Sequence, residues 1–522
     1  MKNSFALLLA CLLLGLTSAA SARAAQRKPN IILVLADDLG AAELSCYGNR
    51  KHATPHLDRM AAEGTRFETF YVNPLCTPTR VALMTGQYGF HNGFLGMQNP
   101  AFTPRSNSPL KDIANHFTHA ELLQGAGYKT ALVGKWQLSG KLPTLVYEAG
   151  FDEYRMWAYE HNLPEDVQHE GRTRNPGNRK IGDRYWWPSI VENGEYRPTS
   201  EHDFGPDLFN DYVIDFARRH RDQPFFVYYT SVLTHDPIVE TPDPANPGSR
   251  LPASFENNLE YLDHLMGRLF AALKSEGLDD DTLVLFVGDN GTGGAGKGTL
   301  TEAGVRVPCI VRGPGVRRGV VSRAVADVTD LLPTLADFAG AKLPDDRPFD
   351  GYSLGPVLRG ERERHRDWIY AHLDDGRIVR DERWLLEVDR SRNGSRGERL
   401  FDCGASRDGT GYRNVTNSDQ PEAQAARARF AAILAALPEP RPHPGMELRD
   451  RTKAATSARG DESRAATFAR RDLDRDGRLS LDEFTTTGTR TPAEAKAVFA
   501  QWDADRDDRL TADEFIARGK PK

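Results

Sequence analysis

The chain is poor in cysteine, in clustered basic residues and in long apolar segments. Its 522 residues include five cysteines, and an odd number excludes a framework in which every cysteine is paired. The formal net charge is −6 and no long basic run occurs, so nothing indicates a nucleic-acid partner. After an apolar run at residues 5–16, no segment is long and apolar enough to cross a bilayer. We therefore expect no transmembrane segment in the mature chain.

The N-terminus has the features of an export signal. Lys2 precedes the apolar run, and small residues close the segment at Ala20, Ser21 and Ala22. A segment of this length is too short for a membrane span and is typical of a cleaved signal peptide. We predict that residues 1–22 are removed and that the protein is exported, either periplasmic or secreted.

Apolar runs of strand length alternate with longer amphipathic segments over residues 28–340. The runs are continuously apolar and rich in Val, Ile and Phe, which is typical of parallel strands buried on both faces. Residues 258–275 carry apolar side chains at helical spacing between two runs. The pattern predicts an α/β domain in which helices flank a mostly parallel sheet. The predicted strands are 31–36, 129–133, 225–229, 282–287 and 307–311.

After about residue 340 the sequence pattern changes to short apolar runs without long helical segments between them. We assign residues 341–437 to a smaller subdomain. Residues 438–463 are rich in proline and polar side chains, so they should form a stiff linker without regular structure. The predicted elements of the subdomain are strands at 368–372, 377–388 and 399–402 and a helix at 420–437.

The C-terminal residues 464–518 contain two loops with the EF-hand pattern for Ca²⁺. In residues 472–483, oxygen-bearing side chains occupy positions 1, 3, 5 and 9, with glycine at position 6 and glutamate at position 12. In residues 503–514, Asp508 replaces the glycine, so we expect weaker binding there. The predicted Ca²⁺-binding residues are Asp472, Asp474, Asp476, Arg478, Ser480, Glu483, Asp503, Asp505, Asp507, Arg509, Thr511 and Glu514.

Helical segments flank both loops, which predicts a paired all-α unit. In an exported protein Ca²⁺ is plentiful, so we expect a structural or docking role for this unit and not that of a cytosolic sensor. The residues expected in its core are Phe468, Phe484, Phe499 and Phe515.

Acidic residues follow two of the predicted strands. Asp37 and Asp38 come after the first strand, and Asp289 and Asn290 come after the fourth. The carboxyl ends of parallel strands meet at one edge of a sheet, so these side chains should lie together. Their oxygen-only set suits Ca²⁺ or Mg²⁺, because Zn²⁺ prefers His or Cys, although a single Asp after a strand more often forms a turn. Two further candidates at this edge are Lys135 and His235.

Residues 76–80 read Cys-Thr-Pro-Thr-Arg and should begin a helix. Thr77 is a good N-cap and Pro78 suits the first helical position, so Cys76 would lie at a helix N-terminus. Backbone N–H groups there attract anions, and Arg80, one turn on, adds a planar fork of donors for oxyanions. A buried structural cysteine is the alternative interpretation of Cys76.

This segment resembles the signature of the type I sulfatases, Cys-x-Pro-Ser/Thr-Arg followed by Thr-Gly, with Thr79 where Ser is commoner. The resemblance extends over residues 29–437 and implies the fold of that family, a branch of the alkaline phosphatase superfamily. It also implies that the smaller subdomain is an antiparallel sheet closed by a helix. Further matching motifs are Ala36-Asp37-Asp38-Leu39-Gly40, Gly134-Lys135-Trp136, His235-Asp236-Pro237, Gly288-Asp289-Asn290-Gly291, and Lys297-Gly298 with Glu302, Gly304, Arg306, Val307 and Pro308.

The resemblance implies a sulfuric ester hydrolase that releases sulfate from a sulfate monoester, with a sulfated carbohydrate as the expected substrate. In this family a formylglycine-generating enzyme oxidises the signature cysteine, here Cys76, to formylglycine, whose hydrated aldehyde is the nucleophile. Asp37, Asp38, Asp289 and Asn290 correspond to the ligands of one divalent cation, Ca²⁺ in preference to Mg²⁺. The residues that correspond to sulfate-binding and catalytic groups are Arg80, Lys135, His235 and Lys297.

Two other functions stay open on the sequence alone. Related formylglycine enzymes hydrolyse phosphonate or phosphate diesters, and a catalytically impaired member could bind sulfated glycans without cleaving them. Gln137 favours the impaired protein, because the family usually has His after Gly-Lys-Trp and glutamine cannot accept a proton near neutral pH. That histidine is the expected base, so either turnover is slow or His161 or Lys135 replaces it.

Two groups of residues keep more than one interpretation. Tyr185, Trp186 and Trp187 could stack on a sugar ring or belong to the core. Cys11 leaves with the signal peptide and Cys76 is assigned to catalysis, so at most one disulfide is expected. The cysteines available for it are Cys46, Cys309 and Cys403.

Overall fold

The computed structural model describes residues 28–98, 109–138, 144–158, 184–390, 397–438, 468, 471–472, 476–486 and 492–517. The predicted signal peptide, His161 and Asp474 lie outside the described residues, as does the predicted linker apart from Pro438.

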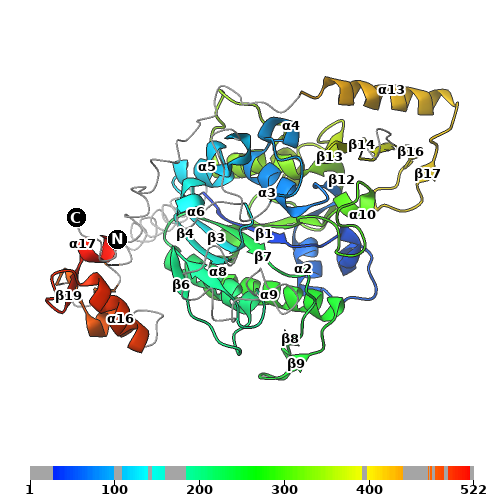
Figure 1. The fold of residues 1–522 in the computed structure, drawn as a ribbon. Helices are drawn as coiled ribbons and strands as arrows, with labels where there is room; N and C mark the ends of the chain where they lie inside the picture. Colours follow the sequence, from blue (N-terminus) through cyan, green and yellow to red (C-terminus); the bar gives the residue numbers. More distant parts are fainter. Residues whose placement is uncertain are drawn as a thin grey trace, which may run out of the picture.

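A ten-stranded sheet forms the centre of the fold (Figure 1). Across the sheet the strands are β12 (Val320–Asp327), β2 (Thr65–Tyr71), β11 (Cys309–Arg312), β10 (Thr282–Gly288), β1 (Asn30–Ala36), β7 (Phe225–Ser231), β3 (Lys129–Lys135), β4 (Glu153–Trp157), β5 (Ile190–Glu192) and β6 (Glu195–Arg197). The block from β10 to β4 is parallel throughout and contains four of the five predicted strands, which confirms them.

The fifth predicted strand, 307–311, corresponds to β11 and is antiparallel to both of its neighbours. The prediction that it belongs to the parallel set is therefore wrong. All four residues of β11 are buried. Continuous apolarity reports burial on both faces of a sheet and not the direction of the strand.

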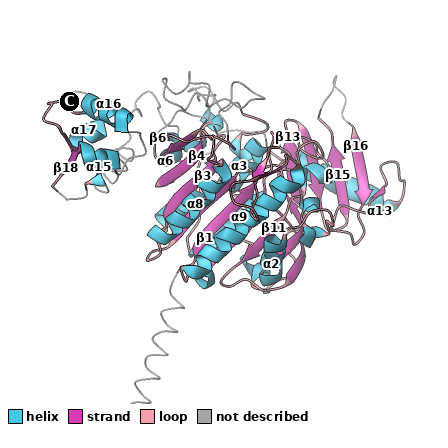
Figure 2. Ribbon diagram, turned by 90° about the horizontal axis from the view of Figure 1, so that it is seen from below, coloured by secondary structure: helices cyan, strands magenta, loops and turns pink. Residues whose placement is uncertain are grey.

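Helices cover both faces of the sheet (Figure 2). Successive residues of β1 point to opposite sides, so Leu33 packs in one core and Val34 in the other. The Leu33 side is covered by α3 (Cys76–Thr85), α5 (His119–Gly125) and α11 (Leu331–Ala339), and the Val34 side by α2 (Pro55–Glu63), α8 (Gly205–Arg219) and α9 (Phe255–Ser275). Short elements complete the domain: α4 (Gly89–Asn92), α6 (Thr144–Glu148), α10 (Glu302–Val305), α12 (Gly355–Leu358), and the ribbon of β8 (Thr241–Pro242) and β9 (Arg250–Leu251).

A second sheet of five antiparallel strands follows. It consists of β13 (Ile369–Leu373), β14 (Gly376–Arg380), β15 (Trp384–Val388), β16 (Glu398–Asp402) and β17 (Arg413–Asn414), and α13 (Pro421–Ala436) packs against it. The predicted antiparallel subdomain is thus confirmed, but the predicted strand 377–388 is a hairpin of two strands. Asp381 makes the turn, because its Oδ1 accepts the N–H groups of Arg383 at 2.8 Å and Trp384 at 2.6 Å.

The C-terminal unit has its own small core. Two short strands, β18 (Arg478–Ser480) and β19 (Arg509–Thr511), pair antiparallel with Leu479 opposite Leu510. Its helices are α15 (Leu481–Thr486), α16 (Pro492–Trp502) and α17 (Ala512–Ala517). The four predicted phenylalanines are buried together with these two leucines, Ala495 and Trp502, which confirms them as core residues.

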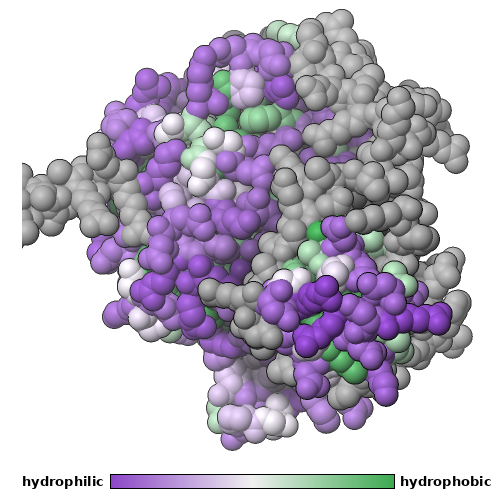
Figure 3. Space-filling view, turned by 90° about the vertical axis from the view of Figure 1, so that its left-hand side faces the viewer, coloured by the Kyte–Doolittle hydropathy of each residue, from purple (hydrophilic) through white to green (hydrophobic). Residues whose placement is uncertain are grey.

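The described surface carries few large apolar side chains, of which Met97, Val321 and Tyr352 are the most exposed. The face turned to the viewer in Figure 3 is mostly hydrophilic, with apolar side chains in small separate groups. No helix within the described residues is long and apolar enough to cross a membrane. Cys46, Cys76, Cys309 and Cys403 are all free thiols, so the one disulfide that the sequence left possible does not form among them.

Candidate active site

Cys76 lies at the start of α3, which begins two residues earlier than predicted. The N-cap is Leu75 and Cys76 is the first helical residue, so the prediction of Thr77 as N-cap is wrong. The Thr77 hydroxyl instead accepts the N–H of Gln98 at 3.3 Å and contacts Met97 Sδ at 3.2 Å. Every residue of α3 is buried, and Cys76 has no exposed surface. The thiol is therefore held at a helix N-terminus inside the protein.

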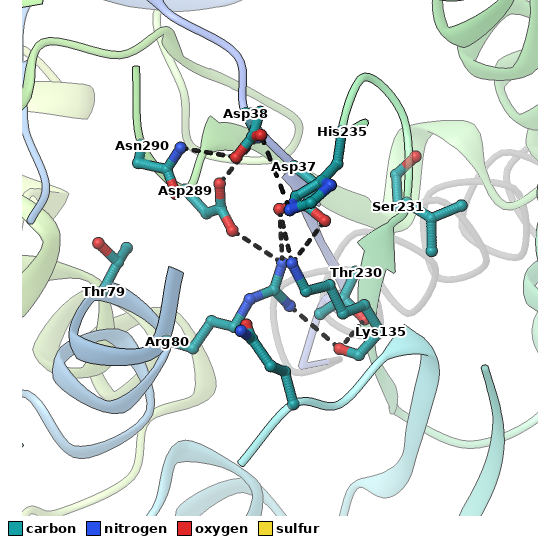
Figure 4. Close-up of polar contacts among 12 residues, drawn as sticks. Asp37, Asp38, Thr79, Arg80, Lys135, Thr230, Ser231, His235, Asp289 and Asn290 are labelled. Carbon is teal, nitrogen blue, oxygen red and sulfur yellow. Dashed lines mark hydrogen bonds and ion pairs between the residues drawn. The ribbon is translucent and has the colours of Figure 1, made fainter. Parts of the chain in front are cut away.

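Arg80 ties this helix to the edge of the sheet (Figure 4). Its Nη2 donates to Asp289 Oδ2 at 2.8 Å and lies 3.7 Å from Asp37 Oδ1, while Nη1 donates to the Lys135 carbonyl at 3.0 Å. The guanidinium therefore contacts the ends of three strands, β10, β1 and β3. Such contacts fix the side chain, which is 1% exposed.

The predicted acidic residues do come together at the carboxyl ends of β1 and β10. The two strands run in register with Ala36 opposite Gly288, so the residues that follow each strand are neighbours. Asp289 Oδ1 accepts the N–H of Asp38 at 3.0 Å, and Asn290 Nδ2 donates to Asp38 Oδ1 at 2.8 Å. Carboxylate oxygens of Asp37 and Asp289 and the Sγ of Cys76 all lie within 4.8 Å of one another.

Two lysines and a histidine surround this cluster. Lys135 Nζ donates to both oxygens of Asp37, at 2.9 and 2.7 Å, and Lys297 Nζ donates to Asp38 at 2.8 Å. His235 Nδ1 is 2.8 Å from the Asp236 carbonyl, which requires a proton on Nδ1, so the lone pair of Nε2 accepts from Lys297 at 2.9 Å. The His235 and Lys297 side chains are 20% and 21% exposed, whereas Lys135 is buried, so they form the open side of the site.

Burial and the charges around the cluster shift the pKa values of its carboxyl groups in opposite directions. Burial acts to raise the pKa of Asp37, but the cations led by Lys135 outweigh it and hold this pKa well below its usual range. Burial and the charge of Asp37 raise the pKa of Asp38, and the same two causes raise that of Asp289 to about 7. Burial lowers the pKa of His235, which keeps the ring neutral.

The donor set of the cluster fits a hard divalent cation. It offers three carboxylates and one amide oxygen, with no histidine needed. Asn290 Oδ1 is buried and accepts no hydrogen bond among the described residues, because only Nδ2 of this side chain is engaged. An unpaired buried acceptor beside carboxylates is the state expected of an oxygen that binds a metal ion.

Gln137, which stands where the resemblance to the sulfatases leads us to expect histidine, follows the end of β3 and so lies at the same edge of the sheet. It adopts a left-handed backbone conformation with φ of 57° and is buried. Its Nε2 contacts Met97 Sδ at 3.3 Å, and its Oε1 accepts nothing among the described residues. Lys135, the other proposed base, has its ammonium bound to Asp37, so it is placed as a donor.

The three aromatic residues 185–187 differ in burial. Tyr185 belongs to the core: it is fully buried, and its hydroxyl donates to the carbonyls of Val232, at 2.9 Å, and His235. Trp186 and Trp187 are half-buried, with their indole N–H groups bound to the Glu240 and Thr199 carbonyls. Sequence reasoning did not anticipate that Tyr185 supports the loop of His235, because the contact joins segments 50 residues apart.

Comparison with known proteins identifies the family. The model of the Sulfatase family matches residues 29–341. This chain belongs to the sulfatase family. It is 35% identical to arylsulfatase A of Homo sapiens over 390 residues, covering 68% of this chain and 73% of that protein. It is 33% identical to N-acetylgalactosamine-6-sulfatase of Rattus norvegicus over 360 residues, covering 65% and 67%. The crystal structure of Ps i-CgsB has a TM-score of 0.64 at 25% identity and covers 78% of this chain and 93% of its own.

These relatives make the protein a sulfuric ester hydrolase with the α/β fold of the sulfatases. The fold, the mostly parallel central sheet and the smaller antiparallel sheet that the sequence predicts are confirmed. The match to the family ends at residue 341, well before the C-terminal unit.

The two acidic loops of this sulfatase have the same internal geometry. Asp472 accepts the N–H groups of Asp476 at 3.1 Å and Gly477 at 3.0 Å, and Asp503 accepts those of Asp507 at 3.2 Å and Asp508 at 3.0 Å. Gly477 and Asp508 both have positive φ, 82° and 59°. Asp508 thus adopts the backbone conformation that a glycine usually supplies. Carboxylate oxygens of Asp503, Asp505 and Glu514 lie within 4.8 Å of one another.

Proposed function

We propose that this sulfatase releases sulfate from sulfated carbohydrates, using a formylglycine made from Cys76 and one bound divalent cation. The single observation that carries the proposal is the placement of Cys76, whose Sγ lies within 4.8 Å of carboxylate oxygens of Asp37 and Asp289 at a helix N-terminus. A carbohydrate substrate is supported by the name of one relative, N-acetylgalactosamine-6-sulfatase, a protein named for a sugar sulfate.

Formylglycine at position 76 is supported by the signature residues and by their chemistry. A hydrated aldehyde would supply a nucleophilic oxygen and a second hydroxyl whose deprotonation releases sulfate, whereas a thiol has neither. Cys76 sits on the first turn of α3, where unpaired backbone N–H groups favour an anionic reactant. A formylglycine-generating enzyme would then be an obligatory partner during maturation.

The proposed cation ligands are Asp37, Asp38, Asp289 and Asn290, whose oxygens are gathered at one edge of the sheet. Ca²⁺ is preferred by resemblance, and Mg²⁺ is the alternative. The bound cation would supply positive charge to the non-bridging oxygens of the ester. The unpaired Asn290 Oδ1 supports this assignment independently of the family.

The basic residues of the site would bind and orient the sulfate group. Arg80 and Lys135 are buried and fixed, so they can present donors to its oxygens without reorganisation. Lys297 and His235 lie on the open side, where the alcohol of the ester would leave. A proton shared between Lys297 Nζ and His235 Nε2, 2.9 Å apart, is available for that departing oxygen.

A substrate comparison tests this proposal against its two rivals. The protein, produced together with a formylglycine-generating enzyme, is given a sulfate monoester, p-nitrophenyl sulfate, and a phosphodiester, bis-p-nitrophenyl phosphate. We expect the sulfate ester to be hydrolysed and the diester to react poorly. Preferred cleavage of the diester would support a phosphonate or phosphate diester hydrolase. Binding of sulfated sugars without cleavage of either ester would support an impaired, glycan-binding protein.

We also propose that the two C-terminal loops bind Ca²⁺ as an EF-hand pair with a structural or docking role. Support comes from the antiparallel pairing of the loops through Leu479 and Leu510 and from their matching geometry. Arg478 and Asp507, 2.7 Å apart, join one loop to the other. Isothermal titration of Ca²⁺ into the EDTA-treated protein tests the proposal, since loops of this kind should add two sites to that of the active site.

We place the protein outside the cytoplasm, periplasmic or secreted, because residues 1–22 have the pattern of a cleaved signal peptide. N-terminal sequencing of the protein recovered from the extracellular or periplasmic fraction tests this, and the expected first residue lies just after Ala22.

A further inference from the structure

Arg184 lies at the edge of the sheet where the candidate active site is built. Its guanidinium carbon is 4.4 Å from the centre of the Trp157 ring. Trp157 is the last residue of β4 and pairs in register with Lys135, the last residue of β3. This cation–π contact holds the guanidinium beside the strand end that carries Lys135. Arg184 is only 5% exposed.

One carbonyl oxygen connects Arg184 to His235. Arg184 Nη2 donates to the Asp236 carbonyl at 2.7 Å, and His235 Nδ1 donates to the same oxygen at 2.8 Å. The guanidinium and the imidazole are therefore immediate neighbours. Since His235 lies on the open side of the site, Arg184 flanks the place where the alcohol part of the ester would sit.

The charge of Arg184 has no acidic partner among the described residues. Arg80 and Arg155, which are buried to a similar degree, each bind a carboxylate, Asp289 at 2.8 Å and Glu192 at 2.7 Å. Arg184 uses one N–H on a neutral carbonyl, and a guanidinium has five. A nearly buried cation without a counter-charge costs free energy, which an anionic ligand would recover.

We propose that Arg184 is a specificity-determining residue that binds a second anionic group of the substrate, a carboxylate or a second sulfate on the same or the adjoining sugar. The planar fork of donors matches either anion. The proposal rests on the proposed function, and it narrows the substrate to sulfated sugars that carry more than one negative charge.

The test compares matched pairs of ligands. Each pair consists of a sulfated monosaccharide with one anionic group and an analogue in which a neutral substituent is replaced by a second anion, for example N-acetylglucosamine 6-sulfate and glucosamine 2-N,6-O-disulfate. Binding is measured by calorimetry in a Cys76→Ala background, where no turnover occurs, and kcat/KM is measured in the formylglycine form. The variants are Arg184→Ala and Arg184→Lys. Arg250→Ala is the matched control, because Arg250 also stacks on a tryptophan, 3.5 Å from the centre of the Trp186 ring, but lies near Glu240.

We expect at least one pair in which the dianion binds more tightly to the protein that retains Arg184. Arg184→Ala should lower the ratio of dianion to monoanion affinity by about 10- to 100-fold, the range of a charge-assisted hydrogen bond. Arg184→Lys should lower it less, because the charge remains and the fork is lost, and Arg250→Ala should leave the ratio unchanged.

Three results would overturn the assignment: equal affinity for both members of every pair, an equal loss of both in Arg184→Ala, or a change of the ratio in Arg250→Ala as large as in Arg184→Ala. An equal loss would mean that Arg184 only positions His235. A preference for the dianion that depends on Arg184, in a protein that cleaves no sulfate ester, would support Arg184 and reject the proposed function, so the two failures are separable.

Discussion

The acidic cluster at the ends of β1 and β10 and the two C-terminal loops both bring acidic side chains together. The cluster draws them from distant parts of the sequence, whereas each loop draws them from one short segment. In the cluster, Asp38 and Asn290 come from positions 252 residues apart and are buried between lysines and an arginine. In the loops, the acidic groups lie within twelve residues of each other and accept hydrogen bonds from their own backbone. The first kind of site needs the whole fold, whereas the second needs one local turn. Removing a residue should therefore have distant consequences in the cluster and local ones in the loops.

The largest effect is expected for Cys76→Ala. Loss of the residue that would become formylglycine should lower sulfate release by more than about 10³-fold, because the nucleophile is absent. Mass spectrometry of tryptic peptides from the active protein should show the aldehyde at position 76. Cys403→Ala, which removes another buried thiol, is the control and should keep its activity. Full activity of Cys76→Ala would refute the assignment.

The next variants contrast the two acidic regions directly. Asp289→Asn removes a carboxylate that also holds Arg80, so it should lose the active-site ion and lower activity by at least about 100-fold. Glu483→Gln with Glu514→Gln should lose Ca²⁺ from the loops and keep sulfate release. Metal content per chain by elemental mass spectrometry distinguishes them. If both variants lose activity to the same degree, the two regions are not independent.

A smaller effect is expected at Gln137, whose side chain cannot serve as a base. If no other group replaces the base, alcohol release should show a burst followed by a slow phase, and Gln137→His should speed the slow phase. The gain is bounded by the ~10²–10⁴-fold contribution of a general base. Gln98→His, at the other buried glutamine near Met97, is the control.

A linear time course of alcohol release, unchanged by Gln137→His, would contradict the prediction that the site lacks a base. Another residue would then already act as base, and His161→Ala would be the next variant to measure.

The smallest effect concerns Asp263, a buried carboxyl group outside both regions. Burial raises its pKa to about 7, although its oxygens accept the N–H groups of Leu57 and His56 at the start of α2. The folded state thus keeps a proton that the unfolded state loses near pH 4, so stability present below pH 4 is lost as the pH rises through 7. In Asp263→Asn this loss should be absent, so the melting temperature of the variant relative to wild type should rise between pH 5 and pH 8. The same difference at both pH values would contradict the raised pKa.

Sequence alone predicted the parts of this protein whose signal is local or strongly periodic. The parallel strands, the long helix α9 and the buried phenylalanines of the C-terminal unit follow from apolar patterns. The direction of β11 did not, because burial on both faces looks the same in either orientation. The hairpin at Asp381 was missed because a single aspartate inside a run of strand-forming residues is a weak turn signal.

In the candidate site, too, residues that follow a strand could be placed from the sequence, whereas residues held by long-range contacts could not. Asp37 and Asp289 could be placed at one edge because both follow recognisable strands. Arg184 could not, because its position depends on the Trp157 ring and the Asp236 carbonyl, which are distant in the sequence. Contacts that join remote loops leave no periodic trace, so only the folded structure reveals them.

The complete burial of Cys76 has a consequence for the order of events during biogenesis. In the folded protein this residue has no accessible surface, and α3 on which it sits is buried along its whole length. An oxidising enzyme cannot reach such a side chain without unpacking the helix. If Cys76 becomes formylglycine as proposed, the conversion must therefore precede packing of α3. Rapid folding would then compete with maturation, and the fraction of active molecules would be set by which of the two happens first.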